Sequence, residues 1–119
     1  MVQQLFADNP AIDIEETVRQ ALAGPARTLK PNARVAVAVG SRGITNLEAI
    51  VSTAIATLKS AGAQPFVLPA MGSHGGGTST GQTALLADFG LTQSRLGVPI
   101  RAAMDTQLVG VAEGGIPVV

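Results

Sequence analysis

Residues 65–82, with the sequence PFVLPAMGSHGGGTSTGQ, join a short apolar strand to a glycine-rich loop and then to the start of a helix. The loop holds the only histidine of the chain, His74, and four of its fourteen glycines. Glycine tolerates positive φ angles and lets other groups approach the backbone closely. Ser79 and Gln82 have the spacing of a capping box, so we expect the helix to begin at Ser79. This pattern is typical of an α/β fold.

A second strand, loop and helix precede this one. Residues 34–39, RVAVAV, are apolar after the first position, which predicts a strand covered on both faces. The loop at residues 40–44 consists of small residues and one cation. Thr45 and Glu48 then have capping-box spacing, and apolar residues at helical intervals predict a helix to about Ala61.

Two successive units of this kind require a right-handed crossover, which makes their strands parallel. We therefore expect Val35–Val39 and Phe66–Leu68 to be neighbouring parallel strands, with the Asn46–Ala61 helix packed on the sheet. The predicted fold class is α/β: a three-layer Rossmann-like domain with a mainly parallel sheet.

The flanking segments add further expectations. An amphipathic helix should begin after Asp13 and end at Gly24-Pro25, because glycine favours the cap and proline cannot continue the hydrogen-bond ladder. The helix from Ser79 should stop at Gly90. Its expected buried residues are Ala84, Leu85 and Phe89.

Beyond Gly90 the pattern is weaker. Residues 91–96 fit a helical turn, and Val98–Arg101 and Thr106–Val111 fit short strands. Residues 114–119 indicate a turn that leads into another strand. We therefore expect residues 1–119 to be a single α/β domain that is the first part of something longer.

Composition narrows the class of protein. Eight basic and eight acidic side chains balance, without a basic cluster, which argues against nucleic acid and anionic membranes as partners. The chain has no cysteine, and its first ten residues lack a signal-peptide pattern, so we expect a cytoplasmic protein. The sequence leaves the oligomeric state open, a homo-oligomer included.

The predicted parallel strands place Arg42 and His74 at the same edge of the sheet, outside the carboxyl ends of the strands, where open α/β sheets bind ligands. A guanidinium fork binds a carboxylate or phosphate bidentately, and an imidazole moves protons near neutral pH. The nonfunctional alternatives are that Arg42 is a solvated loop arginine and that His74 is an ordinary packed or surface residue.

Other chemistries fit less well. Neither loop has the lysine of a phosphate-binding P-loop. Ser73 and His74 are adjacent, and neighbours in sequence do not normally meet in nucleophile–base geometry. One histidine, no cysteine and the isolated Asp88 and Asp105 show no metal-ligand spacing, so we expect no metal ligand in this chain.

Four segments together resemble the N-terminal part of the lactate racemase (LarA-type) family. They are SRGITN at 41–46, the strand at 65–70, GSHGG at 72–76 and GVPIR at 97–101, and the resemblance covers roughly Arg34 to Val119. It implies a racemase or epimerase, hence an isomerase, of small 2-hydroxy acids. It also implies a nickel-pincer nucleotide cofactor, which takes a hydride from the substrate Cα and returns it to either face.

The resemblance also implies residue roles. His74 would be the catalytic base, and Arg42 and Ser41 would bind the substrate. The cofactor would lie against Gly72, Ser73, Gly75 and Gly76. The family's cofactor lysine and nickel-ligating histidine would lie beyond this chain, so we expect the isolated chain to be inactive.

This chain departs from the family at two points. Val39 and Gly43 replace an acidic residue and a proline of the first loop, and Gly75 replaces an arginine that usually follows the histidine. The alternative function is a noncatalytic domain that binds a phosphate or carboxylate.

Overall fold

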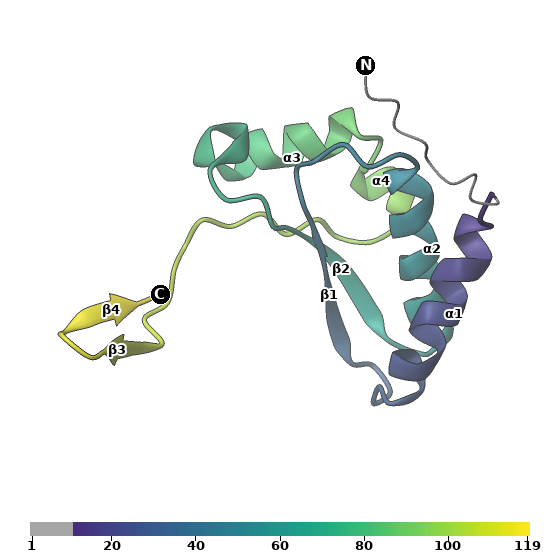
Figure 1. The fold of residues 1–119 in the computed structure, drawn as a ribbon, viewed down its shortest axis with the longest axis horizontal. Helices are drawn as coiled ribbons and strands as arrows, with labels where there is room; N and C mark the ends of the chain where they lie inside the picture. Colours follow the sequence, from purple (N-terminus) through teal and green to yellow (C-terminus); the bar gives the residue numbers. More distant parts are fainter. Residues whose placement is uncertain (1–10) are drawn as a thin grey trace, which may run out of the picture.

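The structure is a computed structural model that describes residues 11–119 (Figure 1). The first ten residues, on which the expectation of no signal peptide rests, lie outside the described part. Its elements are α1 (Ile14–Arg27), β1 (Arg34–Val39), α2 (Leu47–Ser60), β2 (Gln64–Pro69), the 3-10 turn η1 (His74–Gly77), α3 (Ser79–Asp88), α4 (Gln93–Leu96), β3 (Gly110–Ala112) and β4 (Ile116–Val118).

β1 and β2 are parallel neighbours, with Val37 opposite Val67, so the expected pairing is confirmed. A third segment runs beside β2: the Val67 amide donates to the Pro99 carbonyl at 2.9 Å, and the Arg101 amide donates to the Val67 carbonyl at 2.8 Å. The predicted strand at Val98–Arg101 is thus reduced to a single parallel bridge at Ile100. The chain moves in one direction across the sheet, from β1 to β2 to this bridge.

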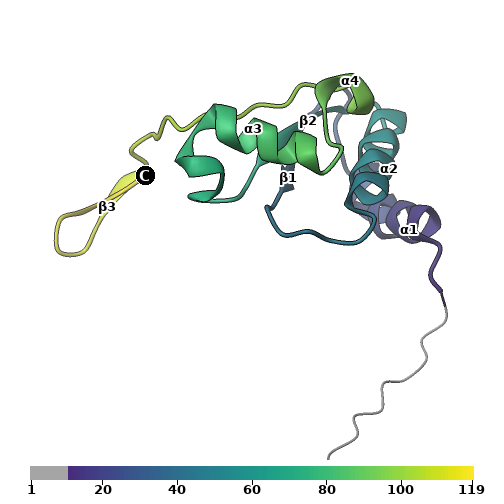
Figure 2. The same ribbon diagram turned by 90° about the horizontal axis from the view of Figure 1, so that it is seen from above.

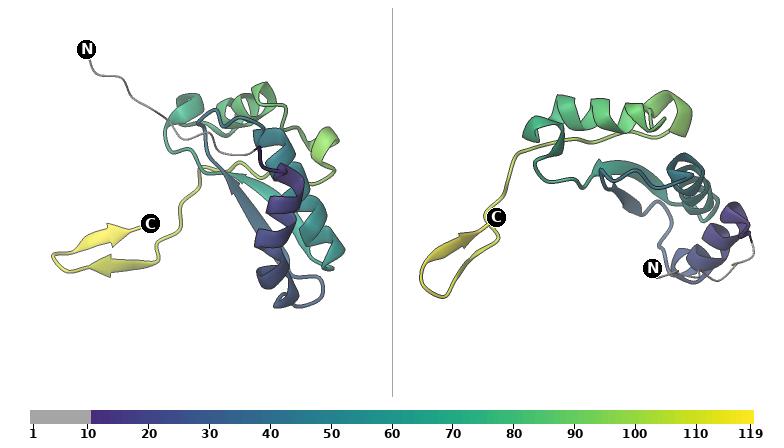
Figure 3. Two further views of the ribbon diagram at one scale, coloured as in Figure 1. Left: turned by 45° about the vertical axis from the view of Figure 1, so that its right-hand side comes forward. Right: turned by 45° about the horizontal axis from the view of Figure 1, so that its top comes forward.

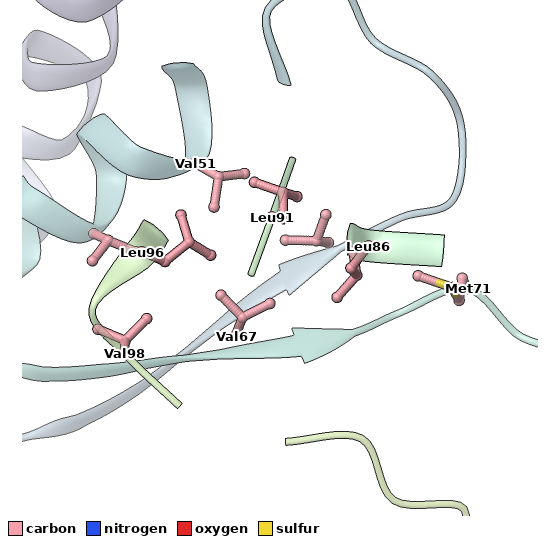
Figure 4. Packing of buried hydrophobic residues seen from close by; sticks show 9 residues of the cluster. Val51, Val67, Met71, Leu86, Leu91, Leu96 and Val98 are labelled. Carbon is pink, nitrogen blue, oxygen red and sulfur yellow. The ribbon is translucent and has the colours of Figure 1, made fainter. Parts of the chain in front are cut away.

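Movement in one direction through right-handed crossovers puts successive helices on the same face of a sheet. The core agrees, because Val67 of β2 points toward Val51 of α2 and Leu86 of α3 (Figure 4). Val67 and Leu86 are fully buried. The buried cluster comprises Val39, Val51, Ile55, Val67, Met71, Leu86, Leu91, Leu96 and Val98.

The opposite face of the sheet is exposed. Ala36 and Ala38 of β1 are open to solvent, and Leu68 of β2 is 38% exposed. The expectation that residues 34–39 are covered on both faces is therefore wrong for the described part of the chain. An apolar run does not require two covers when the apolar side chains on one face are alanines, because small side chains lose little by exposure. Residues 11–119 thus form an α/β fold with one helical layer on one sheet face.

α1 begins as expected, with the Asp13 carboxylate accepting from the Glu16 amide at 2.9 Å. The predicted end at Gly24-Pro25 is wrong, because the helix continues through Pro25 to Arg27. Gly24 does not adopt a positive φ, and a proline in the last turn removes only one backbone donor. α1 packs against α2 at the side of the sheet (Figure 1).

The capping box expected at Thr45 is also wrong. The N-cap of α2 is Asn46, which has a φ of 63° and makes no side-chain cap bond. The Glu48 carboxylate instead pairs with Arg95, 2.9 Å away, and so ties α2 to α4. The end of α2 follows the prediction, since Gly62 has a φ of 80° just after it.

α3 begins at Ser79 as expected, but its cap is not the predicted box of Ser79 and Gln82. Its N-cap is Thr78, whose hydroxyl accepts from the Gly81 amide at 3.0 Å. Ser79 is the first helical residue, and Gln82 turns toward the preceding loop. Leu86 is the fully buried residue of this helix, whereas Ala84 is exposed, contrary to the expectation. Leu85 and Phe89 are partly buried against the core, as expected.

Residues 102–119, which we call the arm, extend away from the sheet and helices (Figures 2 and 3). Its strands β3 and β4 form an antiparallel hairpin around Gly114 and Gly115, both at positive φ. The expected turn into a strand is confirmed, and the strand predicted at Thr106–Val111 is shortened to β3. None of the helices described over residues 11–119 has the length and apolar content needed to cross a lipid bilayer.

Candidate functional site

The loops that follow β1 and β2 meet at one edge of the sheet. The Ala70 amide donates to the Val39 carbonyl at 2.8 Å, which continues the strand pairing into both loops. Beyond this point the Ser41 hydroxyl forms a hydrogen bond with Nδ1 of His74. Residues 33 positions apart are therefore in contact where parallel strands were predicted to bring their loops together.

The backbone around His74 is held by buried groups. The His74 amide donates to the Met71 carbonyl at 3.1 Å, and the Met71 side chain lies in the core. Gln82 of α3, only 4% exposed, donates from Nε2 to the Gly72 carbonyl at 2.8 Å. The imidazole itself is exposed. A rigid core therefore presents a solvent-accessible titratable group, which suits a chemical role.

The glycines of this loop do two different things. A Cβ on Gly75 would lie 2.5 Å from the carbonyl carbon of Gly81, and a Cβ on Gly81 would lie 1.8 Å from the Gly75 oxygen. Gly75 is therefore required for the contact between the loop and α3. Gly72 and Gly76 also have positive φ angles, but a Cβ there would meet open space. Of the three glycines predicted to bind cofactor, these two leave the backbone free for a ligand.

Arg42 lies beside a cavity of about 320 Å³ at the ends of the strands. The side chain is exposed, and within residues 11–119 it has neither an ion pair nor a hydrogen bond. A guanidinium without a partner beside a small cavity can bind a carboxylate through both nitrogens. The cavity is lined by Gly40, Ser41, Arg42, Ile44, Leu47 and Ala70.

Three other hollows carry no charged side chain. One follows the outer face of α3 from Ser79 to Ala87, and one lies beside Gln93–Pro99. The third, about 290 Å³ and mostly apolar, lies between α1 and the sheet. The cavity beside Arg42 is therefore the better candidate for a small anionic ligand.

One residue predicted to bind cofactor, Ser73, is not brought into contact with His74's side chain. Ser73 is exposed at the start of η1 and makes no cap bond, and the hydroxyl that contacts His74 is that of Ser41. Within residues 11–119, histidine, aspartate and glutamate side chains do not form a group of three that could hold a metal ion.

Sequence reasoning missed the contact between Ser41 and His74 and the structural role of Gly81 with Gln82. The parallel strands predicted that the loops would be near each other, but not which side chains would touch. The position of Gln82 is one signal of this structural role, because it stands in the first turn of the helix that follows the glycine loop.

No family model, curated protein or solved structure matches this chain. The site's geometry and the motifs of its two loops are therefore the basis for assigning a function.

Proposed function

We propose that this chain forms the substrate-binding and base-bearing part of an isomerase that racemises or epimerises small 2-hydroxy acids, like the lactate racemase family that its motifs resemble. The observation that carries the proposal is the contact between Ser41 and His74. It places the imidazole beside the cavity that Arg42 lines, so a proton acceptor and a carboxylate-binding group lie at one edge of the sheet.

Arg42 and His74 have different roles in the proposed reaction. Arg42 pairs with the substrate carboxylate through its two-nitrogen fork, which fixes the adjacent Cα. Oxidation at Cα to a 2-oxo acid removes a hydride from carbon and a proton from the hydroxyl. His74 accepts that proton and returns it when the hydride comes back. The hydride acceptor must come from outside the residues described.

The nickel-pincer cofactor implied by the resemblance does not fit the described residues as a metal site. The single imidazole does not belong to any group of three histidine, aspartate or glutamate side chains within residues 11–119. Lys59 donates to the Gly97 carbonyl at 2.9 Å, near the end of α2 farthest from the loops. Gly72 and Gly76 offer open backbone to a nucleotide. We therefore expect the purified 119-residue chain to bind no stoichiometric nickel by elemental analysis and to racemise nothing measurable.

The proposal includes the finer features expected from the sequence. In a three-layer Rossmann-like domain, the exposed sheet face with Ala36, Ala38 and Leu68 would be covered. A cytoplasmic location and a small-molecule substrate belong to the same proposal.

A noncatalytic anion-binding domain is the second candidate. It is favoured by the exposed Arg42, which forms no ion pair with residues 11–119, and by the open backbone at Gly72 and Gly76. Such a domain would bind phosphate as well as carboxylate and would make no use of the imidazole.

Ligand titrations of the 119-residue chain followed by NMR separate the two candidates. We expect D- and L-lactate to shift both the Arg42 guanidinium and the His74 imidazole signals, and propionate, which lacks the hydroxyl, to shift only those of Arg42. Inorganic phosphate should bind more weakly than lactate. If phosphate binds more tightly and lactate behaves like propionate, the isomerase proposal is wrong and the anion-binding domain replaces it.

A further inference from the structure

The Ser41 hydroxyl occupies one of the two ring nitrogens of His74. Its partner is Nδ1, while Nε2 has no hydrogen-bond partner within residues 11–119. Ser41 is half-buried and also lines the cavity beside Arg42. A neutral imidazole has one protonated and one unprotonated nitrogen, and the hydrogen bond at one nitrogen sets the state of the other. Whether Ser41 accepts or donates in this hydrogen bond therefore decides which nitrogen of His74 can act as a base.

We propose that Ser41 is a positioning residue that accepts a hydrogen bond from Nδ1–H of His74 and thereby keeps Nε2 unprotonated. This inference rests on the proposed function for its purpose, since a base needs its lone pair on the nitrogen that is free to meet the substrate. In the opposite tautomer Ser41 would donate to Nδ1, and Nε2 would carry a proton that cannot accept another.

The same arrangement gives the Ser41 hydroxyl a second use. When its oxygen accepts from Nδ1–H, its own hydrogen remains free to donate. Ser41 lines the cavity together with Arg42, so this hydrogen can reach a carboxylate bound there. When Nε2 takes up a proton, Nδ1–H is retained and the bond to Ser41 need not rearrange. A binding role for Ser41, expected from the sequence, and a positioning role are therefore compatible.

The loop geometry supports a fixed position for Ser41. Ser41 follows β1 directly after Gly40, and the Ala70 amide holds the Val39 carbonyl at 2.8 Å. On its other side, the Leu47 amide donates to the Ile44 carbonyl at 3.1 Å and closes the turn into α2. Backbone hydrogen bonds thus hold the chain on both sides of Ser41.

The tautomer can be measured directly because His74 is the only histidine in the chain. Imidazole ¹⁵N NMR of the ligand-free 119-residue chain, above the pH at which the ring is charged, should show a protonated Nδ1 and an unprotonated Nε2. Ser41→Ala should move the tautomer ratio by about two- to tenfold toward Nε2–H, the size of effect that one neutral hydrogen bond produces. Ser41→Thr, which keeps the hydroxyl, should restore the wild-type pattern.

Ser73→Ala is the matched control, because Ser73 is adjacent to His74 but makes no cap bond in the turn. It should leave the tautomer ratio unchanged. A wild-type spectrum with Nε2–H predominant, or equal effects of Ser41→Ala and Ser73→Ala, would overturn the inference.

The experiment is independent of the proposed function, because it uses no ligand. A wild-type Nδ1–H tautomer that depends on Ser41 supports the positioning role even if lactate fails to bind. Conversely, lactate binding with an unchanged tautomer in Ser41→Ala supports the proposed function and removes Ser41 from the positioning role.

Discussion

The arm has a larger share of apolar residues than the strands and helices up to Arg101, yet it leaves most of them exposed. Val67 and Leu86 are fully buried, whereas Val109 and Val111 of the arm are 78% and 63% exposed. In the first region β1, β2, α2, α3 and α4 all contribute to one cluster (Figure 4). In the arm, β3 and β4 pack chiefly on each other. Local sequence is thus enough to form a hairpin, but stability depends on long-range packing, and only the first region provides it.

The clearest test of this difference in packing is the same substitution in each region. Leu86→Ala removes a fully buried side chain and should lower the free energy of unfolding by about 2–5 kcal/mol. Leu108→Ala, at a residue that is 60% exposed, should change it by less than about 0.5 kcal/mol. Urea unfolding followed by circular dichroism measures both. Similar losses in the two variants would mean that the arm is packed in solution.

Two glycines of the loop test the role of packing within the first region. Gly75 and Gly76 have φ angles of 64° and 69°, so alanine is strained at both. Only at Gly75 would the new Cβ meet backbone, 2.5 Å from the carbonyl carbon of Gly81. Gly76→Ala should cost about 1–2 kcal/mol from the left-handed conformation alone, and Gly75→Ala should cost more.

The measurement for these two variants has two parts. Urea unfolding gives the stability, and the His74 imidazole spectrum reports whether the loop has moved away from Ser41. We expect the spectrum to change in Gly75→Ala and to stay close to wild type in Gly76→Ala. Equal stability losses with equal spectra would show that the loop does not depend on its contact with α3.

Much of the first region could be predicted from the sequence. The parallel pairing of β1 and β2 follows from two strand–loop–helix units, and α2 ends near Lys59 and Gly62 as the charge and glycine signals indicate. Helix beginnings were harder, because Thr78 and Ser79 are both good caps and only tertiary contacts of Gln82 favour one of them. The pair Gly24-Pro25 predicts a helix end, but a proline near a helix end costs only one hydrogen bond, and α1 continues to Arg27.

The sequence predicts where the site lies, but not which side chains touch each other there. Parallel strands place Arg42 and His74 at one edge from sequence alone. That Ser41, rather than Ser73, contacts the imidazole depends on how two loops face each other across the sheet edge. The open face of the sheet was also missed, because an alternation of valine and alanine reads as uniformly apolar although only the valines are covered.

The ligand-binding test compares an arginine in the loop after β1 with one at the start of β1. Arg42→Lys replaces a two-nitrogen fork by a single ammonium and should weaken lactate binding about five- to tenfold, measured by NMR titration. Arg34→Lys, at the other end of β1, is the matched control and should leave the affinity unchanged. Equal affinities for all three proteins would remove Arg42 from the site.

Substitution of His74 distinguishes lactate binding from the chemical step at the same edge of the sheet. His74→Ala should leave lactate affinity within about threefold, since Arg42 provides the main attraction. In an active holoenzyme that contains this chain, the same variant should abolish turnover with little loss of cofactor, while Arg42→Lys should chiefly raise KM. A kcat within about threefold of the parent in His74→Ala would refute the base assignment.

The smallest expected effect concerns the arm itself. Removing residues 106–119 takes away the hairpin together with exposed apolar side chains such as Val109 and Ile116, which are 78% and 63% exposed. Because the core cluster includes no residue beyond Val98, the free energy of unfolding should change by less than about 0.5 kcal/mol. The His74 imidazole spectrum should also be unchanged, since both loops of the site are anchored by β1, β2 and α3. Thermal unfolding and the NMR spectrum of the shortened chain test the two statements separately. A lower melting temperature with an intact imidazole spectrum would show that the arm stabilises the fold without touching the site, whereas a changed spectrum would make the arm part of the site.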